Sequence, residues 1–109
     1  MIYHITTEKE WAVCANQSEY APAAFAKEGF IHTSRLHQLE GVLQRYYSGR
    51  KDLLLLKIEE KLVEPDLIYE PSANKELFPH VYGKLNKSAI VEVVDNFTAE
   101  VLTALKSDH

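Results

Sequence analysis

Leu53-Leu54-Leu55-Leu56-Lys57-Ile58 is the stretch that decides the fold, because it is a short and continuous apolar run. Gly49 precedes this run, and the turn-forming sequence Val63-Glu64-Pro65-Asp66 follows it. Apolar runs of this length between turn signals are typical of a strand that is buried on both faces, although leucine alone does not exclude a helix. We therefore predict that residues 53–58 form the central strand of a sheet.

The sequence on either side predicts further strands and short helices. Residues 1–5, 30–32, 67–70 and 89–94 are short apolar runs typical of strands. Helices are predicted after Thr7, from Pro22 to Gly29, after a capping Ser34 and after Thr98. The third of these helices carries apolar residues at helical spacing, namely Leu36, Leu39, Val42, Leu43 and Tyr46. Residues 72–76 are predicted to be an exposed loop, and residues 78–83 an irregular segment interrupted by Pro79 and Gly83.

This order is not a regular strand–helix alternation, so we expect an α+β fold with a mixed sheet and short helices packed against it. The length of 109 residues predicts one domain over residues 1–109. A hydrophobic fraction of 46% and a charged fraction of 26% are ordinary for a globular protein. The net charge of -4 argues against nucleic-acid binding. With a single cysteine and neither a secretory signal nor a membrane-spanning apolar run, we expect a cytoplasmic protein with no membrane partner.

Three histidines, His4, His32 and His80, lie in unusual sequence surroundings, and we predict that they line one pocket. His32 follows a short strand and precedes a predicted helix whose free N–H groups, together with the hydroxyls of Thr33 and Ser34, favour an anion such as a phosphate. The alternative is that Ser34 only caps this helix while His32 satisfies a buried carbonyl. His80 lies in a segment rich in Pro, Gly and aromatic residues, which is rarely a mere connector.

The other candidate residues each have a structural alternative. Tyr82 could stack on a planar ring or pack in the core, and Glu70 could be a catalyst or a surface residue. Three histidines could also bind zinc, but no metal-binding spacing supports this, so we predict no metal. Cys14 is expected to be a buried, inert thiol rather than a nucleophile, and His37 and His109 are expected at the surface.

Taken together, these segments resemble the bacterial proteins grouped as DUF952, a family of unknown function. The resemblance covers about residues 1–95 and is carried by residues 2–6, Trp11, Tyr20, 28–34, Gln38, 52–58, Tyr69-Glu70 and 78–83. Thr33 stands where many relatives are expected to have cysteine. The resemblance implies a split sheet similar to that of the ADP-ribosyltransferase superfamily, which binds NAD in a cleft. His4 would then contact a ribose hydroxyl of NAD, and His32 or Tyr82 would contact the nicotinamide.

The sequence therefore leads to two main functional hypotheses. The first is a divergent NAD-dependent ADP-ribosyltransferase or NAD-cleaving enzyme, with NAD as its substrate. Its predicted catalytic residues are His32, His80 and Glu70, and its predicted ligand-binding residues are His4, Thr6, Thr33, Ser34, Tyr82 and Gly83. The second is a non-catalytic module that binds a nucleotide or a sugar phosphate. A pocket enzyme of another class with a histidine base, and a structural domain with ordinary core histidines, also stay open.

Overall fold

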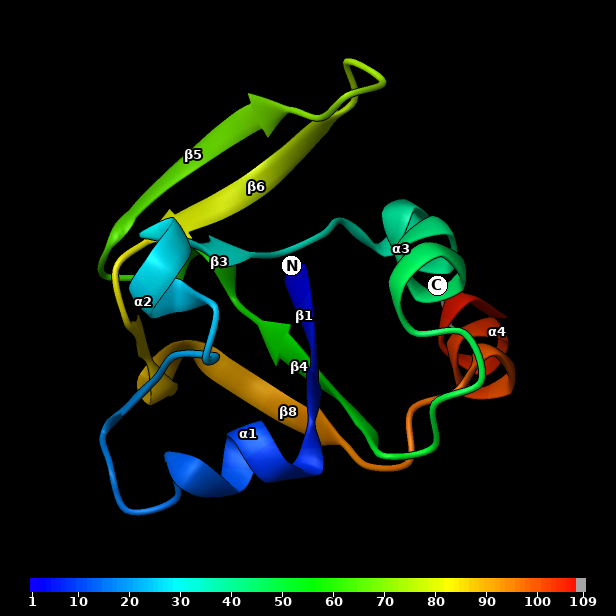
Figure 1. Cartoon of the computed structure of the whole chain (residues 1–109), viewed down its shortest axis with the longest axis horizontal. Coiled ribbons are helices and arrows are strands. Elements are labelled where there is room, and N and C mark those ends of the chain that lie inside the picture. The colour runs from blue at the N-terminus through cyan, green and yellow to red at the C-terminus, as the bar shows by residue number, and fades with distance from the viewer. Residues whose placement is uncertain (108–109) are drawn as a thin grey trace.

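The predicted central strand is strand β4, Leu53–Ile58, in a computed structural model that describes residues 1–107. It lies between β1 (Ile2–Thr7) and β8 (Ile90–Val94) in a three-stranded antiparallel sheet, and Figure 1 shows these strands crossing the middle of the molecule. The prediction for residues 53–58 is confirmed. His109, expected at the surface, lies outside the described residues.

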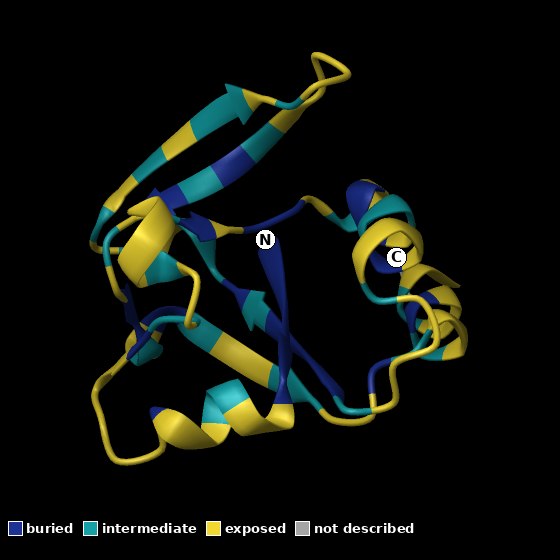
Figure 2. Cartoon of the chain, viewed as in Figure 1, coloured by how far each residue is buried: buried dark blue, intermediate teal, exposed yellow. Residues whose placement is uncertain are grey.

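Two hydrophobic clusters cover the opposite faces of this sheet, which explains the unbroken apolar run in β4. Leu53 and Leu55 belong to the cluster under the helices α3 (Leu39–Tyr46) and α4 (Ala99–Ser107). Leu56 and Ile58 belong to the other cluster, which contains Tyr20. Figure 2 shows β1 and β4 as buried and much of the helical surface as exposed. A strand buried on both faces needs apolar residues at every position rather than at every second one.

A second three-stranded antiparallel sheet lies beside the first and has the order β3 (Ile31–His32), β6 (Leu77–Tyr82), β5 (Asp66–Pro71). A backbone bridge between Tyr3 and Ser34 links the two sheets. A short pair joins β2 (Glu19–Tyr20) to β7 (Leu85–Asn86). The α+β class with small sheets and short helices is confirmed. We expected a mixed sheet, whereas all strand pairs within residues 1–107 are antiparallel.

Short helices and single turns connect the strands, and several of their ends follow the predicted capping signals. The remaining helices and 3₁₀ turns are α1 (Glu8–Val13), α2 (Phe25–Glu28), η1 (Leu36–Gln38), η2 (Glu60–Leu62) and η3 (Lys87–Ala89). Thr7 Oγ1 accepts a hydrogen bond from Glu10 N at 3.2 Å, and Thr98 Oγ1 accepts one from Val101 N at 3.2 Å. Gly29 ends α2 with a φ of 81°, the left-handed conformation that glycine adopts most easily. No helix within residues 1–107 has the length and hydrophobicity needed to span a membrane.

The prediction of an irregular segment at residues 78–83 was wrong, because most of it lies in strand β6. Pro79 is tolerated there for a geometric reason. Its carbonyl accepts hydrogen bonds from the backbone N–H and the hydroxyl of Thr33. Because the nitrogen and the carbonyl of one strand residue point to the same side, the Pro79 nitrogen, which carries no hydrogen, also faces Thr33. Strand β3 has already ended at His32, so no ladder hydrogen bond is lost on that side.

The prediction that Ser34 caps a helix was also wrong. The backbone of Ser34 is held in the bridge to Tyr3, with both N···O distances below 3 Å. The 3₁₀ turn that leads into α3 begins after Arg35, whose N–H donates to Gln38 Oε1 at 2.8 Å. The helical segment therefore begins at Leu36 rather than directly after Ser34, and the anion site predicted beside His32 stays a prediction. Tyr46 also departs from the apolar stripe of this helix, since 71% of its surface is exposed.

Candidate functional site

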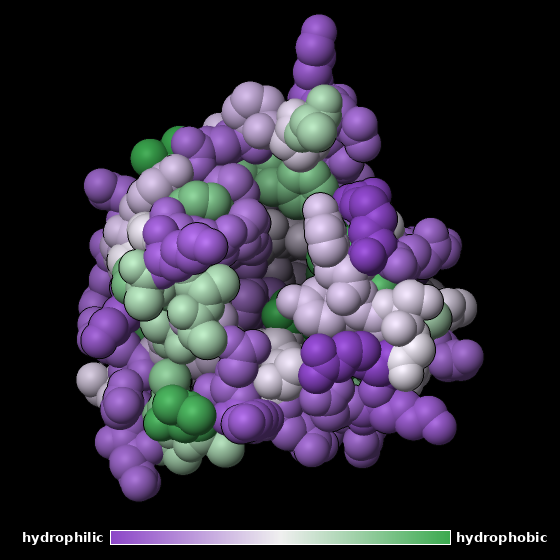
Figure 3. Space-filling view, in the orientation of Figure 1, coloured by the Kyte–Doolittle hydropathy of each residue, from purple (hydrophilic) through white to green (hydrophobic). Residues whose placement is uncertain are grey.

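A cleft of about 780 Å³ lies where the two sheets meet, and the space-filling view in Figure 3 shows this face hollowed between α2 and α3. The cleft is lined by residues of β1, α3, the segment around α2 and β3, and the β5–β6 hairpin. Six of the nine predicted site residues line it: His4, His32, Thr33, Ser34, Glu70 and His80. The predicted convergence of the three histidines on one pocket thus holds in the structure.

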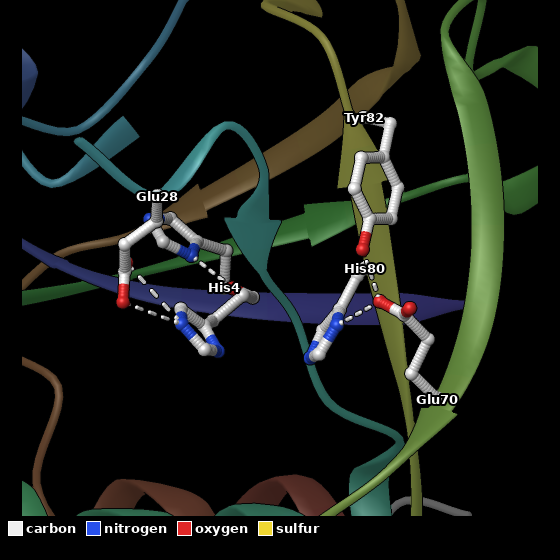
Figure 4. Close-up of polar contacts among 6 residues, drawn as sticks. His4, Glu28, Glu70, His80 and Tyr82 are labelled. Carbon is white, nitrogen blue, oxygen red and sulfur yellow. Dashed lines mark hydrogen bonds and ion pairs between the residues drawn. The ribbon is translucent and has the colours of Figure 1, made fainter. Parts of the chain in front are cut away.

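Glu70, His80 and Tyr82 form a hydrogen-bonded cluster on the β5–β6 hairpin. His80 Nδ1 lies 2.7 Å from Glu70 Oε1, and the Tyr82 hydroxyl donates to the same oxygen. Figure 4 shows the His80 and Tyr82 side chains converging on the Glu70 carboxylate. The pKa of Glu70 is lowered because Tyr82 and His80 both hydrogen-bond to its carboxylate, whereas the pKa of Tyr82 is raised by its bond to Glu70. Glu70 is therefore held in its ionised form.

An ionised Glu70 fixes the tautomer of His80. A carboxylate only accepts hydrogen bonds, so Nδ1 of His80 must carry the proton that is shared with it. Neutral His80 then has a lone pair on Nε2. His80 Nε2 has no hydrogen-bond partner among residues 1–107, whereas every buried side-chain nitrogen or oxygen there has one. This nitrogen is therefore not buried, and it is open to the cleft that His80 lines. The arrangement suits proton transfer to or from a ligand.

His32 and Phe30 complete an aromatic patch around His80. His32 lies directly opposite His80 across the β3–β6 pair, and the two ring centroids are 5.0 Å apart. Phe30 stacks on His80 with centroids 4.3 Å apart and an interplanar angle of 23°. His32 Nε2 lies 3.3 Å from the carboxylate of Glu28. Two imidazoles, each beside its own carboxylate, thus share one wall of the cleft.

His4 has a different environment, because both of its ring nitrogens bond inside the protein. Nδ1 lies 2.6 Å from the backbone oxygen of His32, and Nε2 lies 2.9 Å from the Tyr20 hydroxyl. A carbonyl only accepts, so Nδ1 carries the proton, Tyr20 donates to Nε2, and Thr6 Oγ1, 2.8 Å from the Tyr20 oxygen, donates to Tyr20. Burial lowers the pKa of His4 to about 4 and raises that of Tyr20. His4 therefore holds β3 in place and Thr6 bonds to Tyr20, so neither residue has a ring nitrogen or hydroxyl proton free for a ligand.

Three further predicted residues have structural contacts. The Thr33 hydroxyl is buried and donates to the Pro79 carbonyl at 2.6 Å. Ser34 lines the cleft but contributes its backbone to the bridge with Tyr3. Gly83 has a φ of 154°, and a Cβ at this position would lie 2.9 Å from Pro65 Cβ. The glycine is needed for this close approach, and it lies outside the lining of the cleft.

The sequence reasoning missed several residues of the cleft. Figure 4 shows Glu28, on the opposite side of His80 from Glu70, and further missed residues lining the cleft are Glu10, Arg45, Tyr46 and Tyr47. Alternation at every second residue in Phe78-Pro79-His80-Val81-Tyr82 could have revealed a strand that presents one aromatic face. Nothing in the sequence signals that α3 forms the facing wall. No group of three metal-ligating side chains is placed to bind a metal ion in the described part of the chain.

Known proteins resemble this chain in sequence and in fold. A family model described as "Protein of unknown function (DUF952)" matches residues 5–93. The crystal structure of protein CC0527 from Caulobacter crescentus is 28% identical, covers 94% of this chain and 97% of that one, and gives a TM-score of 0.81. The solution NMR structure of CC0527 is 31% identical over 91% of this chain and 87% of that one, with a TM-score of 0.74. No curated protein matches this chain significantly. The expected likeness to ADP-ribosyltransferases stays a prediction.

Proposed function

Because this chain belongs to the DUF952 family of proteins of unknown function, we propose a function from its own cleft: cleavage of NAD, or transfer of ADP-ribose from NAD, by the Glu70–His80 pair. The observation that carries this proposal is the 2.7 Å contact between Glu70 and His80 Nδ1, which leaves Nε2 open to the cleft. A volume of about 780 Å³ lies within the range of small-molecule sites.

Breaking the bond between ribose and nicotinamide makes two demands that these residues can meet. The bonding electron pair leaves with the nicotinamide nitrogen, so positive charge builds up on the ribose carbon and its ring oxygen. A nearby carboxylate stabilises such a centre, and Glu70 provides one whose Oε2 has no hydrogen bond to the described residues. The acceptor, water or another hydroxyl, must then lose a proton as it bonds to the ribose carbon. His80 Nε2 takes up that proton as a general base.

The remaining residues of the cleft bind and position the substrate in this proposal. Phe30, Phe78, Tyr46 and Tyr47 offer aromatic surfaces against which a planar ring can pack. Because His32 lies opposite His80, its side chain can contact the same planar ring of the substrate. His4 positions β3 through the His32 carbonyl, in place of the ribose contact that the resemblance implied. NAD is the substrate, and the proposal involves no metal.

The direct test is to incubate the protein with NAD and to measure released nicotinamide by chromatography. The proposal expects release by the wild type, little release by His80→Gln, and normal release by His37→Gln, since His37 does not line this cleft. Melting curves with and without NAD report binding separately. The proposal would be overturned if NAD caused no shift in melting temperature and no nicotinamide were released.

A second candidate function is a non-catalytic module that binds a nucleotide or a sugar phosphate. It is favoured by the two internal hydrogen bonds that Glu70 Oε1 already accepts, which give the proposed catalytic carboxylate a structural role in the wall of the cleft. A rise in melting temperature with NAD, without any release of nicotinamide, would favour this module over the enzyme.

A further inference from the structure

The acidic side chains of the cleft already have partners in the protein. Glu28 lies beside His32 and Glu70 beside His80, each within 3.3 Å. Glu10, from α1, accepts a hydrogen bond from the backbone N–H of Ala23 at 2.7 Å. Each of these three carboxylates is thus hydrogen-bonded to another group of the protein.

Arg45 is the cleft-lining arginine, and it has a different environment. Within residues 1–107 its guanidinium group forms neither an ion pair nor a hydrogen bond. The group folds back along α3, where Gly41 leaves it room, since a Cβ on Gly41 would lie 3.0 Å from Arg45 Nη1. It also lies over the ring of Tyr46, 5.9 Å from the ring centroid, and that ring is itself largely exposed. An unpaired guanidinium beside exposed tyrosine is typical of a binding surface.

We propose that Arg45 binds the phosphate of a ligand whose planar ring packs in the cleft against the aromatic patch around Phe30 and His80. A guanidinium group presents a planar set of N–H donors that matches the oxygens of a phosphate, and Arg45 has all of these donors free. The sequence predicted an anion at the N-terminus of the helix after Ser34, whereas this inference moves the anion to the C-terminal half of the same helix, on the facing wall. It rests on the proposed use of the cleft as a ligand site, but not on catalysis.

The test compares two ligands that differ in one phosphate, nicotinamide mononucleotide and nicotinamide riboside. Dissociation constants are measured by calorimetry for the wild type, Arg45→Gln, Arg45→Lys and the control Arg50→Gln. Arg50 is paired with Asp52 outside the cleft, so its loss removes the same charge without touching the site. Because charge-assisted hydrogen bonds to phosphate are strong, we expect the mononucleotide to bind the wild type and Arg50→Gln about tenfold more tightly than the riboside.

In Arg45→Gln the two ligands are expected to bind within about twofold of each other, and Arg45→Lys should restore part of the preference because it keeps the charge. An unchanged preference in Arg45→Gln, or no binding of the mononucleotide to the wild type, would overturn the inference. Release of nicotinamide from NAD is measured on the same samples and reports on the proposed reaction alone. A phosphate preference that depends on Arg45 without any release would support Arg45 as the phosphate ligand and reject the catalytic proposal.

Discussion

Around His4 and around His80 the protein builds two polar clusters with opposite properties. His4, Tyr20 and Thr6 form a fully buried chain in which every hydrogen-bonding group is used. Glu70, His80 and Tyr82 form a partly exposed cluster in which one imidazole nitrogen is left open. Both histidines lie on strands that border the same cleft. The difference shows that a histidine's place in the sequence does not decide its role, whereas the groups that cover its two nitrogens do.

The largest expected effect of breaking this contrast is on activity. His80→Ala should lower the rate of nicotinamide release by a factor of about 10²–10⁴, because it removes the proposed base. The free energy of unfolding should change much less, since His80 is only partly buried. Release assays and urea unfolding on the same samples measure both quantities. His37→Ala, which removes an exposed histidine outside this cleft, serves as the control. Full activity in His80→Ala would contradict the assigned role.

The second largest expected effect is a loss of folding stability at acid pH that is caused by His4. The pKa of His4 is lowered to about 4 in the folded protein, against about 6.5 when unfolded. Below pH 6.5 the His4 side chain therefore binds a proton in the unfolded chain but not in the folded one. The free energy of unfolding consequently decreases as the pH falls from 6.5 to about 4. The shift corresponds to roughly 3 kcal/mol.

Unfolding free energies from urea titrations at several pH values would measure this loss. In His4→Gln the fall over this pH window should be smaller than in the wild type by that amount, whatever the stability of the variant at neutral pH. His37→Gln should behave like the wild type. Identical pH profiles for the wild type and His4→Gln would show that His4 is not held neutral.

A smaller contrast is expected between two tyrosines. Tyr20→Phe removes the central hydroxyl of the buried chain and leaves His4 Nε2 without a donor, which should destabilise the protein by about 1–3 kcal/mol. Tyr82→Phe removes a hydroxyl from the exposed cluster and should change stability by no more than about 0.5 kcal/mol. Chemical unfolding of both variants measures the difference. Equal destabilisation would mean that the two clusters do not differ in the way described.

The sequence predicted those parts of the fold that depend on local signals. The run Leu53–Ile58, the caps at Thr7 and Thr98 and the stop at Gly29 all act through residues a few positions apart, and the structure confirms them. Ser34 was misassigned because its backbone forms a bridge with Tyr3, a residue distant in sequence. Pro79 was misassigned because it is tolerated in β6 only where β3 has already ended, which the sequence does not show.

For the candidate site, the sequence predicted which chemistry-bearing residues meet but not how they divide their roles. Glu70 and His80 were both candidates, and the β5–β6 pairing brings them together. The burial of His4 depends on Tyr20, whose strand pairs with β7 near the other end of the chain. Arg45 and Tyr46 read as ordinary residues of an amphipathic helix until α3 is placed across the cleft. Such long-range packing leaves no signal in a single sequence.

The most direct test of the central claim is chemical modification of the histidines by diethylpyrocarbonate, followed by mass spectrometry of each peptide, with and without NAD. The reagent needs an accessible, unprotonated ring nitrogen. The account predicts that His37, His32 and His80 react in the folded protein, that His4 reacts only after unfolding, and that NAD protects His32 and His80 but not His37. Reaction of His4 in the folded protein as fast as His37, or a reactive His80 that NAD does not protect, would contradict the account.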